Sequence, residues 1–154
     1  MSSTDDLLNF EADGGCAHCG LRDVRALTIH HLDQSKPKNE GYDNKLYLCH
    51  NCHHCHHAGK GPTSEQLREI KRRLIVKTLT IPGLNAMKQA YRRGHVVAMP
   101  FLVNHLIEQR YLEYKEVVSN WVRSDQGPDA LVDMTVVYTI TERGQQLLEK
   151  WALK

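Results

Sequence analysis

Two Cys-x-x-Cys pairs constrain the fold of this chain more than any other feature. The first pair is Cys16 with Cys19, the second is Cys49 with Cys52, and residues 20–48 lie between them. Four thiolates on two tight turns satisfy the tetrahedral coordination that a structural zinc ion prefers. In a reducing compartment such pairs indicate a metal site rather than disulfides. The sequence therefore predicts a structural zinc, and a fold that gains free energy from it.

A fifth cysteine, Cys55, forms a competing pair with Cys52. The segment Leu46-Tyr47-Leu48 predicts a short strand that leads into Cys49. That strand places the tight turn at residues 49–52 and a helix after it, so we favour the pairing of Cys49 with Cys52. Cys55 then lies one helical turn further on, where a buried and unreactive thiol is the usual finding.

Histidine is the second unusual feature, because most of the ten histidines lie between residues 18 and 57. Residues 25–29 predict a strand that delivers His30 and His31. Adjacent side chains on a strand point to opposite sides, so one histidine can bind a metal while its neighbour reaches a different atom. A polar loop follows this strand and ends at Asn44.

Further histidines follow Cys52, in the run His53-His54-Cys55-His56-His57. On a helix, His53 and His57 are four residues apart and share one face, which is a chelating arrangement. His50 and His54 have the same spacing, so spacing alone leaves both pairings open. Neutral imidazole is a favoured ligand of zinc, nickel and similar ions.

These residues together form a motif of known type. It consists of Cys16-x-x-Cys19, Ile29-His30-His31-Leu32, Tyr42-Asp43-Asn44 and Leu48-Cys49-x-x-Cys52-His53 with His57. The motif resembles the HNH endonucleases of the four-cysteine type, over roughly residues 15–58. The fold that this resemblance implies is a ββα-metal, treble-clef-like element, in which a hairpin packs on a helix. The family usually has a leucine directly after its asparagine, where this chain has Lys45.

The resemblance implies a metal-dependent endonuclease that hydrolyses DNA phosphodiester bonds, with double-stranded DNA as its expected partner. His30, His53 and His57 resemble the ligands of a catalytic divalent metal such as Mg²⁺, Mn²⁺, Ni²⁺ or Zn²⁺. His31 resembles the general base, and Asn44 resembles the asparagine that braces the loop and the base. A bound ion would act as a Lewis acid on the phosphate while His31 takes a proton from water.

The sequence divides into three regions. We expect a flexible arm over residues 1–14, the HNH module over 15–80 and a smaller domain over 81–154. The module should include a helix at 64–78, which begins with a capping-box pattern of Thr63 and Gln66. Basic residues are frequent from Lys60 to Lys77. They indicate either a solvated helix face or a helix that contacts phosphates.

The last region predicts helices and strands in the order of a small winged-helix-like domain. After a separator at Ile81-Pro82-Gly83 we expect these elements: helix 84–93, strand 96–97, helix 100–109, β-rich runs 111–122 and 131–140 around a polar turn at 124–129, and a last helix ending near Trp151. Residues 137–148 resemble the final strand and helix of winged-helix proteins. Contact with DNA and contact with a protein partner or a second copy of the chain are both open. The fold class expected for the whole chain is α+β.

The composition of the chain places weaker limits on its function and location. The net charge of +2 gives no global field for nucleic acid, and no apolar run approaches the roughly 20 residues that span a membrane. The N-terminus lacks the pattern of a signal peptide, so a cytoplasmic location is the default expectation. The competing hypothesis is a non-catalytic, zinc-dependent DNA-binding or regulatory protein that keeps the HNH scaffold. Such a scaffold needs only the four cysteines, so the intact histidine and asparagine set favours the enzyme.

Overall fold

The computed structural model describes residues 4–35, 41–118 and 135–154. It confirms the α+β class, because six α-helices and two small antiparallel sheets occur in these ranges. The chain divides into two compact units, Ser2–Thr78 and Leu79–Lys154. None of the helices in the described ranges is long and apolar enough to cross a membrane. The turn expected at 124–129 lies outside the described residues.

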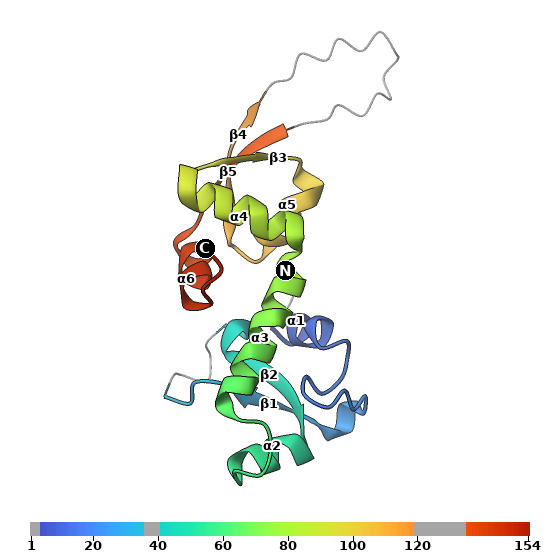
Figure 1. Ribbon diagram of the computed structural model, residues 1–154. Helices are drawn as coiled ribbons and strands as arrows, with labels where there is room; N and C mark the ends of the chain where they lie inside the picture. Colours follow the sequence, from blue (N-terminus) through green and yellow to red (C-terminus); the bar gives the residue numbers. More distant parts are fainter. Residues whose placement is uncertain (1–3, 36–40, 119–134) are drawn as a thin grey trace, which may run out of the picture. The chain divides into compact units, whose positions relative to one another are not determined.

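The first unit is built on a β-hairpin followed at once by a helix (Figure 1). Strand β1 (Leu27–His31) pairs with β2 (Lys45–Cys49) in antiparallel register, and His30 lies opposite Leu46. Helix α2 (His50–His57) starts directly after β2 and contacts both strands. Cys49 caps it, since its sulfur accepts a hydrogen bond from the Cys52 backbone N–H at 3.4 Å. The turn expected at 49–52 is therefore the first turn of the helix.

Helix α3 (Ser64–Leu79) packs over the hairpin and closes the core of this unit. Its capping box is formed as predicted: the Thr63 N–H donates to Gln66 Oε1 at 2.8 Å, and the Gln66 N–H donates to Thr63 Oγ1 at 3.2 Å. The core combines apolar side chains with the cysteine sulfurs, and its buried members are Cys16, Leu46, Leu48, Cys49, Cys52 and Leu67. Three of the four cysteines predicted to bind zinc are thus part of the packed interior, whereas Cys19 is exposed.

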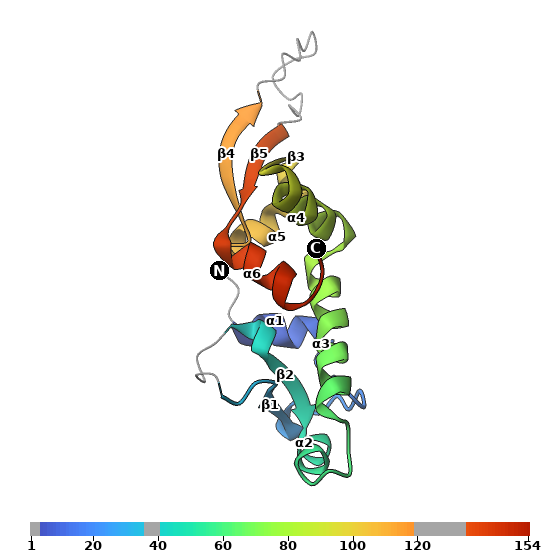
Figure 2. The same cartoon turned by 60° about the vertical axis from the view of Figure 1, so that its left-hand side comes forward.

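The second unit places three helices around a three-stranded sheet. Its elements are α4 (Ile81–Arg93), β3 (Val96–Ala98), α5 (Pro100–Glu108), β4 (Leu112–Val118), β5 (Thr135–Ile140) and α6 (Glu142–Lys150). The strand order is β3-β5-β4, and Figure 2 shows β4 and β5 side by side as a two-stranded ribbon. The separator expected at Ile81-Pro82-Gly83 is wrong. These residues form the first turn of α4, where proline is tolerated and the Thr80 hydroxyl accepts from the Gly83 N–H at 3.2 Å.

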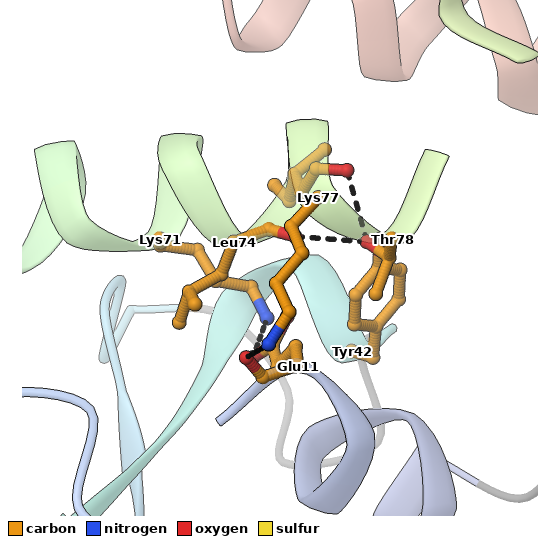
Figure 3. A network of polar contacts seen from close by, with 7 residues as sticks. Glu11, Tyr42, Lys71, Leu74, Lys77 and Thr78 are labelled. Carbon is orange, nitrogen blue, oxygen red and sulfur yellow. Dashed lines mark hydrogen bonds and ion pairs between the residues drawn. The ribbon is translucent and has the colours of Figure 1, made fainter. Parts of the chain in front are cut away.

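The expectation of a flexible arm is wrong for residues 4–11. They form helix α1 (Thr4–Glu11), in which Leu8 and Glu11 are buried. The Glu11 carboxylate accepts a hydrogen bond from the Lys71 ammonium at 2.5 Å, and neither side chain is exposed to solvent. Figure 3 shows Lys71 and Lys77 reaching from α3 to the end of α1. Lys71 therefore belongs to neither a solvated face nor a phosphate-binding face.

This buried ion pair also contacts the loop that holds the predicted asparagine. Lys71 Nζ lies 4.4 Å from the centre of the buried Tyr42 ring, a cation–π distance. Tyr42 opens the 3₁₀ turn Tyr42–Asn44, and its hydroxyl lies 3.2 Å from that of Thr78. Burial raises the pKa of Glu11 to about 7, although Lys71 acts in the opposite direction. The carboxylate therefore depends on Lys71 to stay ionised in this environment.

We predict that Lys71→Met destabilises the first unit by about 3–5 kcal/mol, because it leaves a buried carboxylate without its partner. The double variant Glu11→Gln/Lys71→Met should lose less, since no unpaired charge remains in the interior. Urea-induced unfolding followed by far-UV circular dichroism measures both losses. The single variant Glu11→Gln completes the cycle. If the double variant loses the full sum of the losses in Lys71→Met and Glu11→Gln, the residues are not coupled and the interpretation is wrong.

Candidate metal centres

The four predicted zinc ligands come together at one point. The sulfur atoms of Cys16, Cys19, Cys49 and Cys52 all lie within 4.8 Å of one another. Two sulfurs bound at about 2.3 Å to a tetrahedral zinc ion would be about 3.8 Å apart. The Cys19 and Cys49 sulfurs are 3.7 Å apart. The four cysteines therefore fit a structural metal such as zinc, and this group does not include Cys55.

The electrostatics of this group are those of a site that a bound cation would stabilise. Burial raises the pKa of the Cys16 thiol, but backbone N–H groups of Cys19, Cys49 and His18 outweigh it and lower the pKa to about 7. The pKa of Cys52 is raised, first by burial and then by the neighbouring thiols. Several thiolates cannot ionise side by side in this core without a positive charge between them. A divalent ion supplies that charge.

Three of the predicted histidines form a second group. The ring nitrogens of His30, His53 and His57 lie within 4.8 Å of one another. His53 Nε2 and His57 Nε2 are 3.1 Å apart, close to the roughly 3.3 Å expected for two nitrogens bound at about 2.0–2.1 Å to a tetrahedral ion. Of the two pairings that spacing left open, the one that joins His30 in this group is His53 with His57. The alternative pair, His50 and His54, is not part of the group.

His30 comes from β1 and points its ring at helix α2. It is 3% exposed, and its ring centroid lies 5.2 Å from that of His53 and 5.6 Å from that of His57. Its Nδ1 is a buried polar atom without a hydrogen-bond partner. Such an atom is expected where a side chain binds a ligand such as a metal ion. Burial, followed by the neighbouring histidines, lowers the pKa of His30 to about 4. The ring is therefore neutral at neutral pH, which is the state that binds a metal.

The other two predicted residues lie beside this group. His31 ends β1 opposite Lys45, and its Nε2 is enclosed without a hydrogen-bond partner. Among the described residues, His31 makes no ring contact with His30, His53 or His57. Asn44 is buried, and its amide holds the backbone of Asp33: Oδ1 accepts from the Asp33 N–H at 3.0 Å, and Nδ2 donates to the Asp33 carbonyl at 3.1 Å. Asn44 thus fixes the segment that follows His31.

Two further histidines near these groups, His18 and His56, are not part of the motif predicted from the sequence. His18 Nδ1 lies 3.5 Å from the Cys52 sulfur, within the first cysteine knuckle. The His56 ring lies 4.8 Å from the His30 ring and 5.2 Å from the His57 ring. The spacing of His53 and His56, three residues apart on one helix, was a signal that would have found the second of these.

Comparison of the chain with models of protein families, with curated proteins and with solved structures finds no match. The resemblance to HNH endonucleases therefore rests on the motif residues themselves. In the structure, the four cysteines and three of the histidines of this motif form two separate groups.

We predict that the purified protein holds about one tightly bound zinc ion per chain at the cysteine group. Cys49→Ser should lose this ion and unfold the first unit, because the sulfurs are part of its core. Cys55→Ser, the matched control, should keep both the ion and the fold. Elemental analysis after dialysis gives the zinc content, and circular dichroism gives the fold. Equal zinc loss in the two variants would contradict the assignment.

Proposed function

We propose that this protein is a metal-dependent endonuclease of the HNH type that hydrolyses phosphodiester bonds in DNA. The observation that supports this most is the convergence of the His30, His53 and His57 nitrogens on one point, with His31 next to His30 on the same strand. The four cysteines form a separate group, so the histidines are not needed as zinc-holding scaffold. A hairpin followed by a helix is also the arrangement that the ββα-metal element requires.

The chemistry follows from the nature of the substrate. A phosphodiester is anionic and repels nucleophiles, and a divalent ion held by His30, His53 and His57 would neutralise charge on the scissile phosphate and on the leaving oxygen. In this proposal His31 takes a proton from the attacking water, since histidine exchanges protons near neutral pH. Asn44 acts indirectly, because it holds the backbone of Asp33 and so limits the movement of the strand end that bears His31.

The second unit has a supporting role in this proposal, as a winged-helix-like domain that contacts DNA or a protein partner. Helix α5, Pro100–Glu108, contains no lysine or arginine. A helix that tracks a nucleic-acid backbone neutralises phosphates with such residues. Phosphate contacts of this unit are therefore expected elsewhere, for example at Arg92 and Arg93, which are exposed near the end of α4.

We predict that the protein nicks or linearises supercoiled plasmid when a divalent metal is supplied. His31→Ala should lower the rate by about 10²- to 10⁴-fold, the usual contribution of a general base. Zinc at the cysteine group should stay bound in this variant, because His31 is not among its ligands. Gel electrophoresis of plasmid incubated with Mg²⁺, Mn²⁺, Ni²⁺ or Zn²⁺ measures cleavage.

His54→Ala is the matched control, because His54 is exposed on α2 and lies outside the histidine group. It should cleave at the wild-type rate. If the wild type and His31→Ala behave alike, the nuclease assignment is wrong. A wild type that binds DNA without cleaving it under any metal would instead support a non-catalytic, zinc-dependent regulator.

A further inference from the structure

We infer that Lys45 binds a backbone phosphate of DNA beside His31. The inference deepens the proposed function and rests on it for the identity of the partner. HNH endonucleases usually have a leucine at this place, directly after the asparagine, so the motif assigns Lys45 no role.

The pairing of the hairpin places Lys45 next to His31. The two residues are partners in the register of β1 and β2. One step further on, the Leu32 N–H donates to the Asn44 carbonyl at 2.9 Å, so Leu32 and Asn44 form a hydrogen-bonded pair. The pair of His31 with Lys45 is then of the non-hydrogen-bonded kind, in which side chains come closest. Such side chains lie on one face, with Cβ atoms about 4.5–5.5 Å apart.

The two faces of the hairpin differ in burial. His30 and Leu46 are the next pair along the strands, and their side chains point to the other face because successive residues alternate. Both are buried, Leu46 in the core of the unit and His30 against the histidines of α2. His31 and Lys45 are only partly buried. A ligand from solvent can therefore reach the face that they share.

Lys45 has no counter-charge in the part of the chain that the structure describes. It makes no hydrogen bond or ion pair there, whereas Lys71 and Lys77 of the same unit pair with Glu11 and Asp13. A partly buried ammonium without a carboxylate partner is available to an anion from outside. Lysine binds phosphate groups as a point charge, so a phosphate oxygen is a suitable partner.

The charge along this face is uneven. Tyr47 lies two residues beyond Lys45 on β2 and on the same face. Burial, followed by the charges of Asp5 and Asp6, raises the pKa of Tyr47, so acidic residues of α1 make that end of the face negative. Negative charge repels a phosphate. A nucleic-acid backbone is therefore expected at the end of the face that bears His31 and Lys45.

This contact suits the proposed reaction. A phosphate held by Lys45 would lie beside His31, which in that reaction takes a proton from the attacking water. Lys45 donates hydrogen bonds to phosphate oxygens and takes no part in proton transfer. It also occupies no coordination position at the histidine group, so such positions stay free for water and for the scissile phosphate.

The test uses the full-length protein with zinc at the cysteines and a fluorescently labelled DNA duplex, without added metal for the histidine group. Fluorescence anisotropy from about 50 to 200 mM NaCl gives the slope of log affinity against log salt. Lys45→Leu removes one phosphate contact, so this slope should become shallower by about 1 for every duplex sequence. Lys45→Arg keeps the charge and should keep the wild-type slope. So should Lys154→Leu, the matched control at an exposed lysine.

The slope separates a phosphate contact from a merely structural role, because a loss of packing changes stability without changing the number of phosphates neutralised. Lys45→Gln replaces Lys45→Leu if circular dichroism shows that the latter does not fold. A wild-type slope in the neutral variant overturns the inference, and the nuclease assignment stands if the wild type still cleaves plasmid. A shallower slope with no cleavage by the wild type under any metal supports the contact and makes the nuclease assignment wrong. A wild type that binds no duplex overturns the inference.

Discussion

The grouping of four cysteine sulfurs that could hold one structural metal ion is the constraint on which the first unit depends. Cys16 and Cys19 come from a knuckle near the N-terminus, whereas Cys49 and Cys52 lie at the junction of β2 and α2. Cys16, Cys49 and Cys52 lie in a small core with Leu46, Leu48 and Leu67, whereas Cys19 is exposed. Because a core of this size contributes limited hydrophobic free energy, a metal bound by the four cysteines would supply a large share of the stability.

Helix α2 links this constraint to the chemistry. Its first turn contains Cys52 and is capped by Cys49, and its later turns carry His53 and His57, which group with His30 on β1. One short helix therefore contributes to two groups that could hold metal ions, one of cysteines and one of histidines. A change that displaces the cysteine group would also displace the helix that bears His53 and His57. In the proposed function, stability and catalysis would therefore be coupled through α2.

The sequence predicted the parts that depend on local spacing. Cys-x-x-Cys spacing predicted both cysteine pairs. The periodicities of two and 3.6 residues predicted the strand that bears His30 and the helix face that His53 and His57 share. The missed parts depend on partners far away along the chain. The sequence predicts a loose arm where helix α1 forms, because the burial of α1 depends on the contact of Glu11 with Lys71, 60 residues later. The buried ion pair of Lys71 could not be predicted for the same reason, because the composition of the basic run does not show which of its charges has a buried partner.

The central claim is that one small unit holds two metal sites with separate donor sets, thiolate and imidazole. X-ray absorption spectroscopy tests it most directly, on protein with zinc at the first site and nickel at the second. The account predicts only sulfur neighbours at about 2.3 Å around zinc and only nitrogen or oxygen neighbours at about 2.0–2.1 Å around nickel. Mixed sulfur and nitrogen shells at either metal would contradict it, because the cysteines and histidines would then share one site.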